Sequence, residues 1–365
     1  MKPKIIAFYL PQYHPFPEND KWWGKGFTEW TNVCKAKPLF KGHYQPKIPA
    51  DLGFYDLRLP EVREQQAEMA KEAGIYGFCY WHYWFEGHEL MQRPFDEVVE
   101  SGKPDFPFCI GWANESWESK LWNKDGSSLG GKILIKQTYS GEDDINHFNR
   151  LLKVFKDKRY IKIEGKPLVF IHRGMLLPKH VIVNWNNLAQ ENGLPGIFFI
   201  GRIPDVEDKT HTDYLTLKTE GFNGFTFSRL GNSLENQNVI QKILRHLKGH
   251  IIYHGCVAVT TYSKDMRGWI KKNIDCKDDV FPEIYSNWDH SPRSGKKAII
   301  LNNSTPQLFK IALEELLKLI RKKTETRQIC FIKSWNEWGE GNYLEPDLKY
   351  RDSYLKVIKE ITNEL

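Results

Sequence analysis

Long hydrophobic runs are missing from this sequence of 365 residues. Its first apolar stretch spans only residues 5–10, because Pro11 and Gln12 end it. A helix that crosses a bilayer needs roughly 20 apolar residues, and the core of a secretory signal needs about 7–15. We therefore expect no membrane span and no signal peptide, and we expect a cytoplasmic location.

An excess of charge of one sign is also missing. The 52 Lys and Arg residues are balanced by 46 Asp and Glu residues, so that the formal net charge is only +6. Basic segments that bind nucleic acid usually contain runs of five or six like charges, and no such run occurs here. The composition does not indicate a nucleic-acid partner.

Cysteine is sparse, and its spacing suggests no pairing. The six cysteines are scattered without any CxxC motif. Cys79, Cys109 and Cys330 lie inside apolar, strand-like runs, where a reduced thiol packs as a small hydrophobic side chain. We expect all six cysteines to be free thiols.

Motifs that hold metals, phosphates or dinucleotides are absent as well. Histidines such as His82 and His290 have no ligand spacing, whereas metal sites gather several ligands. No GxSxG elbow directly follows an expected strand, no GxxxxGK[ST] motif occurs, and the turn after the first apolar run, residues 9–14, contains no glycine. That turn argues against a dinucleotide-binding open sheet. We expect no metal and no cofactor.

Aromatic side chains, by contrast, are abundant. They make up 14% of the chain, with 13 Trp, 16 Tyr and 21 Phe, which is more than packing usually requires. Because flat rings stack on the faces of sugars and of bases, these two are the leading candidate ligands.

Apolar runs alternate with amphipathic helical patterns along the chain, which is typical of a parallel sheet covered by helices. The expected strands are residues 5–10, 76–81, 108–112, 168–172, 197–201, 224–227, 284–286 and 329–334. Helical apolar faces are expected within 62–73, 145–155, 181–188, 240–247, 313–320 and 354–361. The second of these follows a capping pattern from Ser140 to Asp143.

Eight strands, each followed by a helix, is the number that closes a (β/α)₈ barrel, and no linker rich in Pro, Gly or Ser divides the chain. The sequence therefore predicts an α/β fold, a single (β/α)₈ TIM barrel domain over residues 1–365 with elaborated loops at its C-terminal face. A doubly wound open sheet is the alternative.

Five of the eight expected strands end in aromatic and polar residues together. Barrels of this kind build their sites at these ends, where rings can stack on a pyranose while amide and carboxyl groups bind its hydroxyls. We predict a site for an oligo- or polysaccharide. The predicted substrate-binding residues are Tyr9, Gln12, Trp81, His82, Tyr83, Trp112, Asn114, Glu115, Trp288, Asp289, Asn336 and Trp338.

Glu337 and Glu340 are the predicted catalytic pair. They follow the last strand three residues apart, and on a helical turn their Cβ atoms would lie about 5–6 Å apart. Two close carboxylates are the equipment of a glycosidase, in which one group is protonated and the other ionised. Arg173, Arg202 and Arg293 also follow strands and could hold a phosphate or a sugar carboxylate, although ordinary ion pairs are favoured for them.

Five long segments resemble the WbsX-like family, which belongs to bacterial surface-polysaccharide gene clusters and is related to glycoside hydrolase family 99. They are AFYLPQYHPFPENDKWWGKGFTEWTNV, GFCYWHYWF, CIGWANESW, NWDHSPR and SWNEWGEGNYLEPD. They occur in order and cover nearly the whole chain.

This resemblance implies a (β/α)₈ barrel and a retaining enzyme of the kind that cleaves α-mannosidic bonds within a chain. Family 99 carries its two acids in an NEWxEG-type motif, which falls here on residues 336–341. The resemblance thus implies that Glu340 is the general acid/base. It implies that Glu337 removes the proton of the substrate's 2-hydroxyl, giving a 1,2-anhydro sugar rather than the covalent intermediate of most retaining enzymes.

Three functions follow as alternatives. The favoured one is a retaining, endo-acting glycoside hydrolase for a surface polysaccharide such as an O-antigen or capsule. The second is a glycosyltransferase in the biosynthesis of such a polysaccharide, as the label of the WbsX-like branch implies. A transferase would need a site for a sugar-nucleotide diphosphate, and no DxD motif follows an expected strand. The third is an inactive carbohydrate-binding scaffold, which the two retained glutamates argue against.

Overall fold

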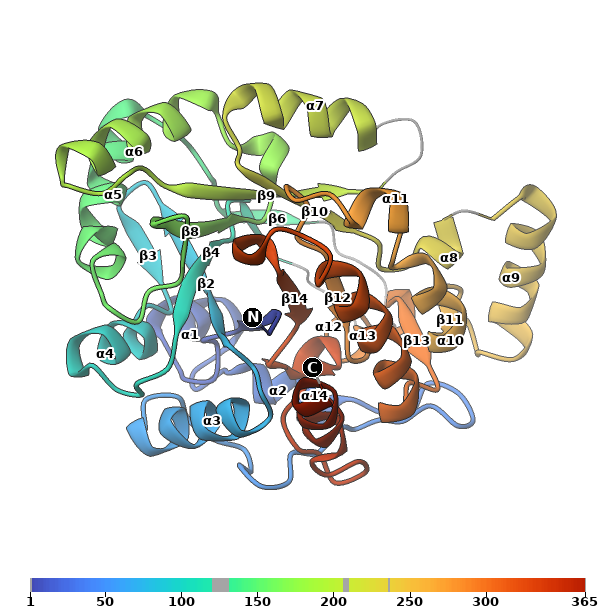
Figure 1. Cartoon of the computed structure of the whole chain (residues 1–365). Coiled ribbons are helices and arrows are strands. Elements are labelled where there is room, and N and C mark those ends of the chain that lie inside the picture. Colours follow the sequence, from blue (N-terminus) through green and yellow to red (C-terminus); the bar gives the residue numbers. More distant parts are fainter. Residues whose placement is uncertain (1, 120–130, 206–209, 236, 365) are drawn as a thin grey trace.

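Eight parallel strands follow one another around a ring (Figure 1). The computed structural model describes residues 2–119, 131–205, 210–235 and 237–364. The ring strands are β1 (Lys4–Tyr9), β2 (Gly77–Phe85), β4 (Phe108–Trp112), β8 (Lys166–Ile171), β9 (Phe198–Pro204), β10 (Gly224–Ser228), β12 (Glu283–Tyr285) and β14 (Ile329–Lys333). All eight predicted strands are confirmed. The largest boundary difference is at β2, which runs on to pair with β3 (His88–Leu90).

The ring closes between β10 and β12. Phe225 of β10 forms a parallel bridge with Val280, just before β12. The amide of Phe225 donates to the carbonyl of Asp279 across 2.8 Å, and the amide of Phe281 donates to the carbonyl of Phe225 across 2.7 Å. The fold is therefore a (β/α)₈ barrel, and the open-sheet alternative is wrong.

Helices follow the strands and cover the outside of the ring, as Figure 1 shows. They are α3 (Pro60–Glu72), α4 (Arg93–Ser101), α5 (Gly141–Phe155), α6 (Lys179–Glu191), α7 (Thr210–Glu220), α13 (Pro306–Ile320) and α14 (Ser353–Glu364). The predicted cap of α5 is confirmed, because the amide of Asp143 donates to Oγ of Ser140 across 3.2 Å. Apolar faces of these helices are buried, as at Leu313 and Leu317 of α13.

The apolar face predicted within 240–247 does form a helix, α9 (Val239–Ile251), but it does not cover the barrel. Gly249 is the buried residue of α9, whereas Ile240, Ile243, Leu244 and Leu247 are all exposed. The expectation that this face is part of the core is wrong. Periodicity indicates a helix but not what its apolar side contacts.

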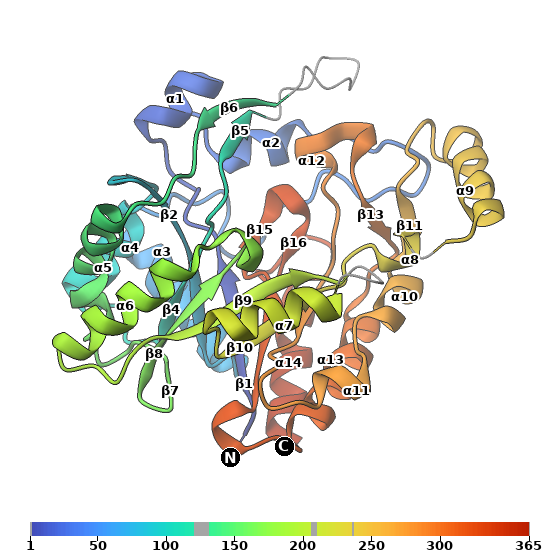
Figure 2. The same cartoon turned by 90° about the horizontal axis from the view of Figure 1, so that it is seen from above.

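Extra elements gather beyond the carboxyl ends of the ring strands, at the top of Figure 2. They include α1 (Pro17–Trp23), α2 (Glu29–Lys35), β5 (Trp117–Ser119), β6 (Lys132–Ile135), β11 (Val259–Thr261), α12 (Ser291–Ser294), β13 (Ile300–Asn302), β15 (Asn336–Glu337) and β16 (Asn342–Tyr343). The remaining short elements are β7 (Lys162–Ile163), α8 (Asn232–Glu235), α10 (Tyr262–Asp265) and α11 (Lys272–Asp275). The prediction of elaborated loops at this face is confirmed.

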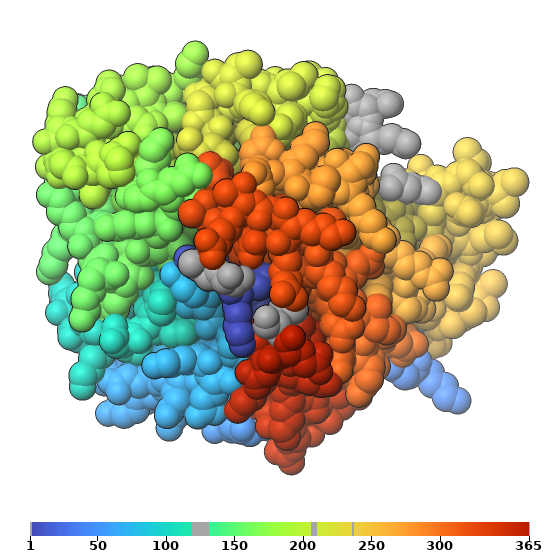
Figure 3. All heavy atoms as spheres, in the orientation of Figure 1, coloured from blue at the N-terminus to red at the C-terminus, as the bar shows by residue number. Residues whose placement is uncertain are grey.

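The two chain ends lie at the opposite end of the barrel (Figure 2). Figure 3 shows that end with the start of β1 near its centre and with α9 projecting from one side. All six cysteines are free, as predicted. Within the described ranges, no helix is long and apolar enough to cross a membrane.

Candidate active site

Side chains on the ring strands alternate between the barrel interior and the outer helices. Trp81 points inward, where its ring stacks on Phe8 with centroids 4.7 Å apart. Phe8 also contacts the rings of Phe170 and Phe331, at 4.8 and 5.4 Å. These four rings fill the barrel, so that any site must lie above them, where the strands end.

Three of the predicted sugar-binding residues point the other way. The hydroxyl of Tyr9 donates to Gln66 of α3 across 2.6 Å, Nε2 of His82 lies 2.7 Å from Nε2 of His147 on α5, and the ring of Trp112 stacks on that of Trp185 on α6. Tyr9, His82 and Trp112 are thus packed between the barrel and its helices. The structure does not bring them to the barrel mouth.

Glu337 lies at the barrel mouth directly above the inward rings. Its Oε2 accepts a hydrogen bond from Ser334 across 2.6 Å, and its Oε1 accepts one from Nε1 of Trp81 across 3.2 Å. Burial and then the charge of Glu340 raise the pKa of Glu337, although the charge of Lys333 opposes the change. These surroundings therefore favour the protonated form of Glu337.

Glu340 is slightly more exposed and is bound to a cation. Nη1 of Arg293 donates to Oε1 of Glu340 across 2.7 Å, and Nε2 of His290 lies 3.8 Å from the same oxygen. Nε of Arg293 also donates to the buried Glu29 across 2.9 Å. Burial would lower the pKa of Arg293, but the charges of Glu29 and Glu340 outweigh it and raise this pKa well above its usual range.

Glu337 and Glu340 lie on a tight turn that requires glycine at positions 339 and 341. Glu337 ends β15, residues 338–340 form one 3₁₀ turn, and β16 follows. A Cβ atom on Gly339 would lie 1.8 Å from Oε1 of Glu29. Gly341 has φ +57° and lies against Lys47 and Asp289, and such a φ favours glycine. The glycines of the motif let this turn pack closely against α2 and α12.

Asn336 and Trp338 hold the turn in place from beneath. The side-chain amide of Asn336 accepts from the amide of Leu10 across 2.7 Å and donates to the carbonyl of Leu10 across 3.0 Å. Trp338 stacks on Tyr343 with ring centroids 3.7 Å apart. Both side chains are buried, and their contacts position the turn.

Glu345 is a buried acid that anchors the same turn. It accepts hydrogen bonds from Trp338, Gln66 and Tyr55, at 2.6, 2.6 and 2.9 Å. Burial raises the pKa of Glu345 to about 7, although these hydrogen bonds oppose the change. This carboxyl is a support for the site, below the pair that faces the mouth.

Asp289 has a structural role of the same kind. It accepts from His43 and Gln45 across 2.8 and 2.6 Å, and from the amide of Ser291 across 3.0 Å. Burial alone would raise the pKa of Asp289, but the hydrogen bond from His43 and the charge of Lys47 hold it well below its usual range. Asp289 ties the loop after α2 to the segment that carries Arg293.

Glu115 lies at the rim of the mouth with a cation beside it. Nε of Arg173 donates to Glu115 across 2.7 Å, and Nε2 of His172 lies 3.5 Å from its other oxygen. Burial opposes these partners, yet they lower the pKa of Glu115 to about 2. Asn114 braces this rim, since its side chain accepts from the amide of Arg173 across 2.8 Å.

Lys333 is the cation at the centre of the mouth. Its Nζ lies 6.0, 5.6 and 5.9 Å from the ring centroids of Phe8, Trp81 and Trp288. The half-buried Trp288 stacks in turn on His290, with centroids 6.2 Å apart. Rings that surround an ammonium group interact favourably with its charge, and this cluster lies beside Glu337.

The other predicted residues lie around this cluster. Tyr83 is close enough to Glu337 that this charge, after burial, raises the pKa of the tyrosine. The backbone carbonyl of Gln12 accepts from the amide of Glu29 across 3.3 Å. Nη2 of Arg202 pairs with Glu283 across 3.2 Å inside the barrel. Arg173, Arg202 and Arg293 each pair with a carboxylate. Ordinary ion pairs are what the sequence analysis favoured for them.

Sequence reasoning missed Lys333, Glu29 and Glu345. Lys333 is the last residue of a strand that otherwise reads as apolar, and a charge at that position was a usable signal. Glu345 lies within the SWNEWGEGNYLEPD segment, where an acid beyond the predicted pair was the available signal. Glu29 offered no signal, because its partner Arg293 is far away in the sequence. Among the described residues, no three His, Cys, Asp or Glu side chains gather into a group that could hold a metal ion.

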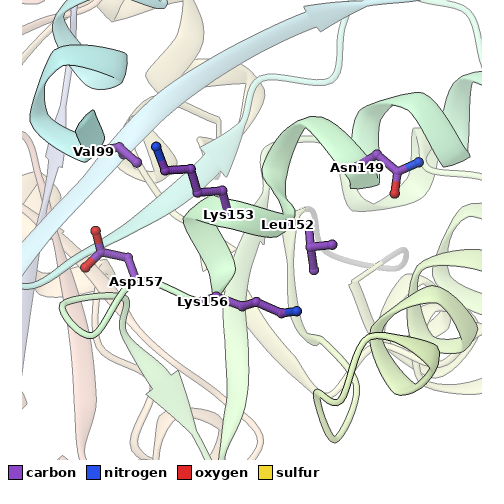
Figure 4. Close-up of a pocket in the computed structure, with 6 residues that line it drawn as sticks. All are labelled: Val99, Asn149, Leu152, Lys153, Lys156 and Asp157. Carbon is purple, nitrogen blue, oxygen red and sulfur yellow. The ribbon is translucent and has the colours of Figure 1, made fainter.

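An open hollow lies elsewhere, on the outer helical layer (Figure 4). It is lined by Val99 at the end of α4 and by Asn149, Leu152, Lys153, Lys156 and Asp157 at and after the end of α5. None of the residues described above for the barrel mouth lines it, and its open lysine-bearing wall offers no acid pair or aromatic stack. The barrel mouth, and not this hollow, is therefore the candidate active site.

The fold and this mouth define a class of barrel in which two carboxylates meet among aromatic rings. A family model described as "Glycosyltransferase WbsX" matches residues 5–358, and the chain belongs to this family. It is 32% identical over 361 residues to the uncharacterized protein WxcX of Xanthomonas campestris pv. campestris (strain ATCC 33913), covering 98% of this chain and 49% of that protein. The chain thus spans about half the length of the curated relatives it matches.

Solved structures share the barrel at low sequence identity. A protein described as glycoside hydrolase-like aligns with a TM-score of 0.63 and 14% identity, over 99% of this chain and 94% of that one. The GH99 endo-alpha-mannosidase of Bacteroides thetaiotaomicron, in complex with bis-tris-propane, aligns with a TM-score of 0.58 and 15% identity, over 99% and 96%. These likenesses establish a shared fold.

Proposed function

We propose that this protein is a glycan-active enzyme, a retaining glycoside hydrolase that acts on a bacterial surface polysaccharide through Glu337 and Glu340. The observation that carries the proposal is the electrostatic coupling of these two carboxyls at the barrel mouth: the charge of Glu340 raises the pKa of Glu337. Two carboxyls that cannot both ionise freely divide the roles of acid and base.

The surroundings of the pair suit a sugar. Half-buried Trp288 offers a ring face beside the carboxyls, and Tyr83 and Glu115 offer polar groups at the rim. A pyranose ring needs both kinds of contact. The relatives among solved structures that are described as hydrolases support the same proposal by their fold.

The proposed roles require a change at Arg293 when substrate binds. Glu340, as acid/base, must carry a proton to protonate the leaving oxygen, whereas its contact with the Arg293 guanidinium favours the ionised form. Glu337, as the base toward the 2-hydroxyl, must be ionised when that hydroxyl arrives. We propose that the substrate displaces Arg293 from Glu340, so that the proton shared by the pair moves to Glu340.

A second candidate, a glycosyltransferase, is favoured by the description of the family model. A transferase needs cations that can receive a diphosphate. Arg173 and Arg293 at the mouth and Arg202 inside the barrel are each within hydrogen-bonding distance of a glutamate, so a diphosphate that used them would have to break those pairs. Lys333, among the rings at the centre of the mouth, is the further cation that it would meet. This arrangement argues for hydrolysis.

The test is incubation of the protein with surface polysaccharide from its own source organism, without any sugar nucleotide, followed by mass spectrometry of released oligosaccharides. We expect release by the unchanged protein and none by Glu337→Gln or Glu340→Gln. Glu314→Gln, on the outer surface of α13, is the matched control and should release as much as the unchanged protein. Chain extension that depends on an added sugar nucleotide, with no release, would favour the transferase.

A further inference from the structure

Helix α9 presents a largely apolar surface away from the molecule, and the exposed His250 falls within it. Its six exposed apolar residues are each more than half exposed: Val239, Ile240, Ile243, Leu244, Leu247 and Ile251. At about 100° per residue these six positions fall within an arc of roughly 140° on the helix. Lys248 borders one edge of the arc and Lys242 the other. We call these six residues the α9 apolar face.

The attachment of α9 to the body explains why this face is open. A Cβ atom on Gly249 would lie 2.9 Å from Cα of Val257, so the helix touches the following segment at its glycine. Nη1 of Arg245 donates to the carbonyl of Leu234 across 2.8 Å. Arg245 and Gly249 lie on the side of the helix opposite the apolar arc. The fold thus directs the apolar face outward, where α9 projects in Figures 1 and 3.

Three segments without any acidic residue meet beside this helix. A small apolar cluster joins Phe40, Tyr253, Cys256 and Ala298, and the rings of Phe40 and Tyr253 lie 4.8 Å apart. The segments that supply these residues, 30–50, 236–264 and 290–313, contain no Asp or Glu. Their exposed lysines are Lys35, Lys37, Lys41, Lys242, Lys248, Lys264, Lys296 and Lys297.

The charge of this region selects among the partners that could cover the apolar face. A second copy of the chain would bring two acid-free, lysine-rich surfaces together, and like charges oppose such contact. An anionic lipid surface satisfies both features at once, because acyl chains receive the apolar arc while headgroups receive the flanking lysines. A basic amphipathic helix with a large apolar face is typical of segments that lie in the plane of a membrane interface.

We propose that α9 and the lysines beside it form a docking surface for an anionic lipid bilayer. The helix lies in the interface with its apolar face toward the acyl chains. The loop that carries Lys37 and Lys41 also carries His43, which binds Asp289 at the barrel mouth, so docking brings the mouth near the bilayer. The proposal rests on surface features alone and does not depend on the proposed hydrolase activity.

The test is co-sedimentation of the whole chain with lipid vesicles. We expect the protein to sediment with vesicles of phosphatidylcholine containing about 30% phosphatidylglycerol, to remain free with pure phosphatidylcholine, and to be released by salt, since headgroup attraction is screened within a Debye length. Ile240→Glu/Leu244→Glu should weaken binding at least about tenfold. Its control is Ile311→Glu on α13, where the apolar residue is similarly exposed, and it should bind like the unchanged protein.

A second pair of variants isolates the charge. Lys242→Glu/Lys248→Glu should also lose binding, whereas Lys318→Glu/Lys356→Glu, which changes the net charge equally on α13 and α14, should keep most of it. All these positions are exposed, so thermal unfolding should be unchanged in every variant. Equal binding to neutral and anionic vesicles, or no binding to either, would overturn the proposal. So would light scattering that shows a dimer of the unchanged chain and a monomer of Ile240→Glu/Leu244→Glu, since a second copy would then cover the face.

Discussion

Arg293 donates to Oε1 of Glu340 across 2.7 Å while its Nε donates to the buried Glu29 across 2.9 Å. One guanidinium therefore neutralises a carboxylate that faces the barrel mouth and a buried one on α2. Arg293 therefore contributes both to the stability of the fold and to the charge balance of the site. Mutations can separate these two contributions.

Removal of Arg293 should destabilise the protein through Glu29. We expect Arg293→Met to lower the free energy of unfolding by about 3 kcal/mol, because a buried carboxylate is left without its partner. Glu29→Gln/Arg293→Met should recover most of this loss. Urea unfolding of the two variants measures the difference, and a double variant no more stable than the single one would show that Glu29 does not depend on Arg293.

Glu345 should impose a pH dependence on stability. Its pKa in the folded protein is about 7, against an ordinary value of 4.5, so the folded state binds a proton that the unfolded state has already released between these values. Stability from this group is complete below about pH 4.5 and falls as the pH rises through 7, by at most about 3 kcal/mol.

The variant Glu345→Gln cannot titrate and should remove this part of the slope. Unfolding by urea at a series of pH values between 4.5 and 8, for both proteins, gives the difference between the two curves. Parallel curves would mean that Glu345 titrates normally in the folded protein.

A tryptophan at the barrel mouth should contribute to substrate binding, whereas one that points outward to the helices should contribute to stability. Trp288→Ala should weaken substrate binding about tenfold with little effect on stability, because its ring is half-buried at the mouth and available to a sugar. Trp112→Phe should lower the free energy of unfolding by about 1–3 kcal/mol, through its lost packing on Trp185, and should leave KM unchanged. A larger KM effect at Trp112 than at Trp288 would place the substrate elsewhere.

A 2-deoxy-2-fluoro glycoside can show whether Glu337 acts as a base or as a nucleophile. A nucleophile would be trapped as a stable ester by this probe, whereas a base that acts on the 2-hydroxyl loses its proton source when fluorine replaces that group. We expect intact-mass analysis to find no adduct. An adduct mapped to Glu337 would contradict the 1,2-anhydro route while leaving the glycosidase in place.

The barrel could be predicted because its strands are continuous apolar runs, as in Ile5 to Phe8 and Ile329 to Ile332, separated by helical patterns. The proximity of Glu337 and Glu340 could be predicted because two residues that are three positions apart on one turn have side chains on the same side. Both signals are local in the sequence.

The side of the sheet to which each strand residue points could not be predicted from the sequence in this way. Trp81 and His82 are neighbours in the sequence, yet the first faces the barrel interior and the second faces α5, because the pleat sends successive side chains to opposite sides. Sequence reasoning treated Tyr9, His82 and Trp112 as mouth residues because it fixed where each strand ends but not the phase of its pleat. The contact of Arg293 with Glu29 depends on loops that are far apart in the chain, and α9 has the pattern of a core helix although nothing in the described molecule covers its apolar face.

The central claim is that Glu340 protonates the leaving oxygen of a glycosidic bond, and one comparison tests it directly. Turnover by the unchanged protein and by Glu340→Gln is measured on two substrates that differ only in their leaving group, a natural glycoside and an aryl glycoside whose phenol leaves without protonation. The account predicts a loss of about 10²–10⁴ on the natural glycoside and a much smaller loss on the aryl glycoside. Equal losses on both substrates would contradict it.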